Sequence, residues 1–261
     1  MSSTGRALLI LDILATEPEG VRVTDLATTL KVNRAIPHRL LAELVELGYV
    51  IQNPTTERYR ATFKLGSLGL RQLETAGILR WSQDELAALA GESRELVRLA
   101  VASGWVLRFV SKAQGANSAL IIDSTSGAEV VLHATASGKA WLSTLPDDEV
   151  RSVLTQRGLE AKTPHTETDL RLILDEVAQA REVGYAVTHE EMEAGINAIA
   201  APIVPPEAPG RRGVGTVSIA GPSARLTSQV LCDFAPQLKA TAKRLSEQWH
   251  VYDYLAALTF G

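Results

Sequence analysis

The order of apolar segments and turns in residues 1–63 constrains the fold more than any other feature of this chain. Three segments carry apolar side chains at helical spacing: residues 7–14, 26–30 and 36–47. Only the tight turn 31–33 separates the second segment from the third, and Gly48 is placed to end the third. Two short β-type runs follow, 49–51 and 58–60, with a turn at 53–56 between them. Helix, helix, tight turn, helix and hairpin is the order of a winged helix-turn-helix.

The third of these helices has an ambiguous start. We expect Thr24 to cap the second helix and Asn33 to cap the third, which would run from Arg34 to about Leu47. Pro37 conflicts with that start, because it lacks the N–H that would bond the Asn33 carbonyl and its ring crowds that oxygen. Either the first turn is distorted or the helix begins later.

The residue types at these positions suit contact with DNA. In such a module the second helix of the pair enters the major groove, and its N-terminal residues meet base edges. Arginine can bind guanine or phosphate through two donors, and helix N-termini favour phosphate. The candidates are Thr24, Asn33, Arg34, Ala35, His38 and Arg39, with Arg58 and Arg60 on the wing. The alternatives are solvated charges on a small helical bundle and, for His38, simple packing beside the helix.

Charge is unevenly distributed along the chain, whose net charge is −4. Residues 1–77 hold nine Lys and Arg against eight Asp and Glu, whereas the remainder holds 17 against 22. An acidic body with a less acidic head fits a protein of which only the head meets phosphate.

Composition excludes several classes of protein. A single cysteine, Cys232, excludes a disulfide framework and a Cys-rich zinc site, and such a cysteine is usually buried. We also expect no signal peptide, no membrane span and a cytoplasmic location, because no uncharged apolar run approaches roughly 18 residues.

The rest of the chain mixes helical and β-type patterns. Helical spacing predicts a linker helix near 64–75 and five further helices: 81–93, 135–145, 147–155, 168–183 and 227–249. Between them lie six β-rich runs: 97–101, 106–111, 119–122, 185–188, 198–204 and 215–220. This order predicts an α+β domain with a mostly antiparallel sheet flanked by helices. We therefore divide the chain into a winged helix-turn-helix (1–63), a linker helix (64–77) and a larger domain (78–261).

Catalytic motifs are missing from this larger domain. The sequence offers no phosphate-binding loop, zinc-protease helix, nucleophile elbow or dinucleotide loop, and its five histidines lack metal-ligand spacing. Glu190 and Glu191 could act as acid and base, but such a pair more often caps a strand or faces solvent. We expect no enzyme, no cofactor and no metal.

Motifs along nearly the whole chain resemble the IclR family of regulators. In the head they are Ala7–Leu11, Val23–Ala27, His38–Leu41, Leu47–Val50, Arg58–Arg60 and Leu65–Gly69. In the body they are Leu132–Ala140, Gly184–Ala186, Glu190–Glu191, Gly195–Ile203 and Ser218–Pro222. These segments follow the order of the family, which makes the match far more specific than a helix-turn-helix alone.

The resemblance implies a GAF-like effector-binding domain with its ligand on one face of the sheet. The implied pocket positions are Thr135, Ala136, Ser137, Thr188, Ala198, Ser218 and Ala220. Relatives that bind small keto acids carry more polar groups at several of them, so the alanines here favour a larger, partly apolar ligand such as an aromatic acid. Plain core packing is the alternative for each position.

Together these features predict a ligand-responsive transcriptional regulator that binds operator DNA and a small organic acid. Repression is the commoner mode of the family. The alternatives are an activator, an enzyme with a DNA-tethering head, and a protein-interaction module. We expect homodimers, or tetramers formed when two such dimers pair through their effector domains. The dimer seam would be built from apolar residues of the first and linker helices: Leu8, Ile10, Leu11, Leu68, Leu70 and Leu73.

Overall fold

The computed structural model describes residues 1–75, 77–117, 121–122, 127–206 and 212–249. The chain divides into two compact units, Met1–Thr75 and Ala76–Gly261. The predicted linker helix is observed as α4 (Phe63–Thr75), which falls in the first unit.

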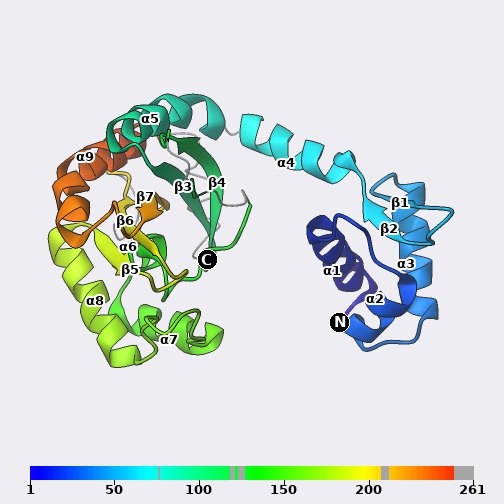
Figure 1. Cartoon of the computed structure of the whole chain (residues 1–261). Helices are drawn as coiled ribbons and strands as arrows, with labels where there is room; N and C mark the ends of the chain where they lie inside the picture. Colours follow the sequence, from blue (N-terminus) through cyan, green and yellow to red (C-terminus); the bar gives the residue numbers. More distant parts are fainter. Residues whose placement is uncertain (76, 118–120, 123–126, 207–211, 250–261) are drawn as a thin grey trace. The chain divides into compact units, whose positions relative to one another are not determined.

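The first unit has the predicted order of helices and hairpin (Figure 1). Its elements are α1 (Ser3–Thr16), α2 (Val23–Leu30), α3 (Ala35–Glu46), β1 (Val50–Gln52), β2 (Tyr59–Ala61) and α4. Ile10, Leu26 and Leu41 are almost fully buried where the first three helices meet. This core also takes in Leu11, so Ile10 and Leu11 are not available for the intermolecular seam expected from the sequence.

The helix starts differ in part from the prediction. Helix α3 begins at Ala35, one residue later than predicted. Pro37 therefore lies in its first turn, where backbone N–H groups have no acceptor within the helix, so the missing N–H of proline costs no hydrogen bond. The N-cap of α3 is Arg34 and not Asn33, although the Asn33 Oδ1 accepts a hydrogen bond from the Ala35 N–H at 2.9 Å. Thr24 is not a cap either, because α2 begins after Arg22 and Thr24 is its second residue.

The second unit is built on a five-stranded antiparallel sheet, as the sequence predicted. Its strands are β3 (Leu96–Ser103), β4 (Val106–Gln114), β5 (Ala186–His189), β6 (Ile196–Ile203) and β7 (Gly215–Pro222). They lie in the order β4-β3-β7-β6-β5, and every neighbouring pair is antiparallel.

Different helices cover the two faces of this sheet. Among the described residues of this unit the helices are α5 (Ile78–Ser93), α6 (Ala136–Leu142), α7 (Asp147–Arg157), α8 (Leu170–Val183) and α9 (Ser228–Glu247). Helices α5 and α9 lie side by side on one face, where Leu99, Ile219 and Leu238 belong to one apolar core (Figure 1). On the other face α6 packs through alanines, among them Ala136 and Ala140, onto Ala200 of β6 and Ala220 of β7.

A β-bulge changes which side chains of β4 face α6. Leu99 pairs with Ser111 but Ala100 pairs with Phe109, so Val110 is an extra residue. Phe109 therefore packs on the α6 side, whereas the Ser111 hydroxyl donates toward Gln83 of α5.

Two further expectations for this unit need correction. Ile121 and Ile122 are not in a strand, and the other two residues of the predicted run 119–122 lie outside the described residues. Cys232 is exposed on α9 rather than buried.

Candidate functional site

The predicted DNA-contacting residues of α2 and α3 are all exposed. They are Thr24, Asn33, Arg34, Ala35, His38 and Arg39. Arg34 and Asn33 lie in the turn that leads into α3, while His38 and Arg39 follow one turn later. Glu43 and Glu46 lie toward the other end of α3, so its basic N-terminal half is the part suited to phosphate.

The two wing arginines have partners within the first unit. The Arg58 Nη1 donates to the Gly20 carbonyl at 2.7 Å, and the Arg60 Nη2 donates to the Pro18 carbonyl. These bonds tie β2 to the loop between α1 and α2. They engage one guanidinium nitrogen of each arginine and leave further donors for DNA.

Sequence reasoning passed over two exposed cations beside α2. Arg22 lies at the N-cap of α2, and Lys31 follows its last residue with a left-handed φ of 52°. The signal that could have found them is their place at both ends of the helix that precedes the recognition helix.

The second unit has a cavity of about 190 Å³ on the α6 face of the sheet. Its lining residues are Arg98, Phe109, Ile122, Ala128, Glu129, Val130, Val131, Thr135, Ala136, Ser137, Thr188, Met192, Glu193, Ile196, Ala198 and Ala220. Six of the seven positions implied by the family resemblance are among them. The exception is Ser218, which is buried on β7 and is not one of the described residues that line the cavity.

Arg98 is one of the cavity residues that sequence reasoning missed. Burial lowers the pKa of Arg98 to about 10, so its guanidinium stays charged at neutral pH. The Cζ of Arg98 lies 4.0 Å from the centroid of the Phe109 ring on the neighbouring strand β4. Because successive side chains of a strand point to opposite faces, the sequence of β3 could have placed Arg98 on the face away from Leu99, which is the cavity face.

The start of α6 forms one wall of the cavity. Thr135 caps this helix, and its hydroxyl accepts a hydrogen bond from the Gly138 N–H at 3.0 Å. Among the described residues that line the cavity, Arg98 is the one cation. Gly138 permits a close backbone crossing, since a β-carbon there would lie 2.2 Å from the Leu132 carbonyl oxygen.

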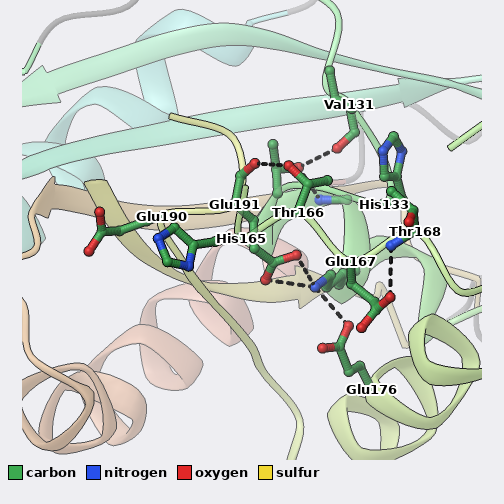
Figure 2. Close-up of polar contacts among 12 residues, drawn as sticks. Val131, His133, His165, Thr166, Glu167, Thr168, Glu176, Glu190 and Glu191 are labelled. Atoms are coloured by element: carbon green, nitrogen blue, oxygen red, sulfur yellow. Dashed lines mark hydrogen bonds and ion pairs between the residues drawn. The ribbon is translucent and has the colours of Figure 1, made fainter. Parts of the chain in front are cut away.

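A buried ion pair lies next to this wall. The Lys139 Nζ lies 2.8 Å and 2.6 Å from the two carboxylate oxygens of Glu191, and 2.7 Å from the Glu176 Oε2. Figure 2 shows the carboxylates of Glu176 and Glu191 converging from two different segments. Burial raises the pKa of Glu191, and the Lys139 charge opposes that shift.

The expectation that Glu190 and Glu191 cap a strand or face solvent is therefore wrong for Glu191, which is buried. Glu190 does cap the turn after β5, because its carboxylate accepts a hydrogen bond from the Gly195 N–H at 2.7 Å. Sequence reasoning gave no partner for Lys139, which lies 52 residues from Glu191.

Two searches of the described residues gave negative results. No group of three or more His, Cys, Asp and Glu side chains there could hold a metal ion. None of the helices in that part of the chain has both the length and the apolar character that a membrane span requires.

A helix-turn-helix whose α3 has an exposed, basic N-terminal half, joined to a unit with a metabolite-sized cavity, defines a class: ligand-responsive, DNA-binding transcriptional regulators. Comparison with known families is specific. Residues 3–54 match the IclR helix-turn-helix domain, and residues 70–247 match the family described as bacterial transcriptional regulator IclR C-terminal. The chain belongs to the IclR family. Members of this family are transcriptional regulators, not enzymes, with a DNA-binding helix-turn-helix and a C-terminal effector-binding domain.

Individual relatives align over most of the chain. The regulator KdgR of Escherichia coli K12 is 28% identical over 256 residues, which cover 97% of this chain and 95% of KdgR. The repressor AllR of the same strain is 28% identical over 241 residues, covering 92% and 88%.

Solved structures agree with the fold. An IclR-type regulator from Silicibacter sp. TM1040 superposes with a TM-score of 0.82 at 28% identity, covering 95% of this chain and 96% of that one. The inducer-binding domain of a PobR double mutant from Acinetobacter, in complex with 3-hydroxybenzoic acid, matches with a TM-score of 0.58 at 25% identity. That match covers 65% of this chain and 97% of the PobR domain.

Proposed function

We propose that this chain is a cytoplasmic repressor that leaves its operator when an organic acid with an apolar body occupies the α6-side cavity. The observation that carries the proposal is the cavity itself, in which one buried cation, Arg98, faces apolar walls and a few hydroxyls. A carboxylate pairs well with a guanidinium, and an apolar body suits the remaining wall. Repression draws support from AllR, whose name describes a repressor.

DNA contact is proposed for the basic half of α3 and its preceding turn. We expect Arg34→Glu and Arg39→Glu to reduce affinity for the operator at least roughly tenfold, since a bidentate base contact contributes about 1–3 kcal/mol. The measurement is fluorescence polarisation with DNA upstream of the gene itself, repeated over a salt series. Arg151→Glu, at an exposed position of α7, is the control with the same change of charge. Unchanged DNA affinity in both α3 variants would favour the protein-interaction alternative.

The ligand class rests on the composition of the cavity lining. The cavity is smaller than the roughly 300–1,000 Å³ typical of drug-sized ligands, which suits a metabolite. The PobR complex supports an aromatic acid by analogy, because that domain was solved in complex with 3-hydroxybenzoic acid. Glu129 and Glu193 also line the cavity, so the carboxylate of the ligand should point toward Arg98 and away from them.

Calorimetry with benzoate, glyoxylate and pyruvate tests this class directly. We expect benzoate-type acids to bind, and Arg98→Met to weaken that binding by roughly tenfold or more. Arg171→Met, at an exposed position of α8, should bind as the unaltered protein does. Tight binding of glyoxylate or pyruvate without benzoate binding would overturn the proposed ligand class.

A homodimer is proposed from the apolar surface of the first unit. Leu8 is 58% exposed, Leu70 is 62% exposed and Phe63 is 95% exposed, and none of the thirteen residues of α4 is buried. Such a surface is unusual unless a partner covers it. Sedimentation should therefore give a dimer or a tetramer, and Leu70→Lys should dissociate it. Leu172→Lys, on the exposed face of α8, should not.

A further inference from the structure

Two walls of the cavity are joined by one ion pair. Helix α6 contributes Ala136 and Ser137 to the cavity lining. Lys139 follows them on the same helix. The loop after β5 carries Met192 and Glu193 into the same lining, directly after Glu191. The contact between Lys139 and Glu191 therefore connects the α6 wall to this loop, which we call the 190–195 loop.

The 190–195 loop is held from outside by a second set of contacts. The Thr166 hydroxyl donates to the Glu191 carbonyl at 2.6 Å (Figure 2), and the Thr163 hydroxyl donates to the Glu190 carbonyl at 2.7 Å. These bonds come from the segment that precedes α8. If that segment moves together with the loop, these two bonds can stay intact. The bond to Lys139 must break whenever the loop moves away from α6.

Lys139 has a second carboxylate partner that does not belong to the loop. Glu176 lies on α8, and its side chain is 42% exposed, against 9% for Glu191 and 2% for Lys139. A buried ammonium without a partner is strongly unfavourable. If the loop lifts, Glu176 still neutralises Lys139, so opening does not leave an unpaired buried charge.

The two carboxylates also act on each other. Glu176 and Glu191 approach the same ammonium, and their mutual repulsion is one of the influences that raise the pKa of Glu191. Glu176 therefore weakens the closed arrangement and stabilises the open one. Glu191 does the opposite, because its bond to Lys139 exists only when the loop is closed.

We propose that Lys139, Glu191 and Glu176 form a releasable latch on the ligand cavity: Glu191 closes the 190–195 loop onto α6, and Glu176 keeps the open state accessible. The role in ligand binding rests on the function proposed above. The latch itself is a property of the ligand-free chain. Its function is to preorganise the cavity wall while still letting a ligand enter.

Hydrogen–deuterium exchange on the full ligand-free chain tests the latch. Glu191→Gln should accelerate exchange of the loop amides by roughly tenfold, because the ion pair that holds the loop closed is lost. Glu176→Gln should slow the same amides, because the open state then leaves Lys139 unpaired. Glu182→Gln, at an exposed position of the same helix, should change neither. Tryptophan fluorescence confirms that each variant is folded.

The opposite signs separate a latch from simple structural support. Faster exchange in both variants would mean that Glu176 and Glu191 merely stabilise the domain, and would overturn the proposal. Unchanged exchange in both would overturn it as well.

Calorimetry with benzoate tests whether the latch affects ligand binding. Glu191→Gln should weaken benzoate binding, and Glu176→Gln should leave it equal or tighter. If benzoate binds none of the proteins, the proposed ligand class fails while the exchange experiment still decides the latch.

Discussion

The two faces of the five-stranded sheet are packed in opposite ways. On the α5 and α9 face, branched aliphatic side chains fill the interface, and the rings of Trp81 and Trp249 meet edge to face at 5.3 Å. On the α6 face, alanines bring the helix close to the strands, and a charged arginine lines an open cavity beside them. The same strands supply both faces, since alternate side chains point in opposite directions.

This contrast assigns stability to one face and leaves the other for the binding proposed above. Large apolar groups on the first face remove much surface from water, which is the main source of folding free energy. The second face retains buried polar groups that contribute less: within the described residues, the hydroxyls of Thr216 and Ser218 have no hydrogen-bond partner. Such groups are tolerated where a domain must keep room for a ligand.

The largest expected effect comes from the stability face. Leu238→Ala removes a fully buried side chain of α9 and should lower the free energy of unfolding by about 2–5 kcal/mol. The measurement is urea unfolding followed by tryptophan fluorescence, which reports on the second unit alone because all four tryptophans lie there. Gln237→Ala, exposed on the same helix, is the control. A loss no larger than that of the control would remove the distinction between the faces.

Overpacking the alanine interface should have the next largest effect. Ala140→Leu adds a large side chain where α6 approaches the sheet, and should destabilise the second unit by about 1–3 kcal/mol. Because the displaced helix also forms a cavity wall, benzoate affinity should fall in parallel. Ala88→Leu, at an exposed position of α5, should alter neither quantity.

A smaller effect is expected from protonation of His133, which precedes α6. Burial lowers the pKa of His133 below its usual 6.5, and its Nε2 lies 3.0 Å from the Glu160 carbonyl oxygen. Between the lowered pKa and 6.5 the unfolded chain binds more protons than the folded one, so stability falls as the pH drops through this window. His133→Gln should reduce this loss in unfolding experiments at several pH values. The exposed His165→Gln should retain it in full.

The smallest effect should come from Ser218→Ala. Removing a buried hydroxyl that lacks a partner should leave stability unchanged or raise it by up to about 1 kcal/mol. Benzoate affinity should also hold, because Ser218 does not line the cavity among the described residues. A large loss of benzoate affinity would indicate that Ser218 belongs to the effector site, as the sequence predicted.

The sequence was sufficient for the elements and for six of the sixteen residues that line the cavity. Helical periodicity located α3, which has one buried face, runs of β-type residues located the strands, and the family motifs pointed to Thr135, Thr188 and Ala198, which line the cavity. Helix starts were less certain: Thr24 was taken for a cap, since capping depends on the local backbone and not on residue type alone.

Contacts between distant segments could not be predicted in the same way. The contact of Arg98 with Phe109 depends on how β3 and β4 pair, and the β4 bulge, which no pattern in the sequence announces, turns Ser111 to the face opposite Phe109. The ion pair of Lys139 and Glu191 depends on how α6 and the 190–195 loop meet in three dimensions. The sequence alone does not show how close α6 and the 190–195 loop lie to each other.

The backbone crossing at Gly138 has a consequence for how this domain can evolve. Alanines around the cavity can be exchanged for larger or more polar residues one at a time, each altering the shape available to a ligand. Gly138 allows no such step, because any side chain there would meet the backbone of Leu132, which cannot turn aside as a side chain could. New ligand preferences are thus open to gradual change around a point that must stay fixed, and divergence of specificity should leave this glycine in place.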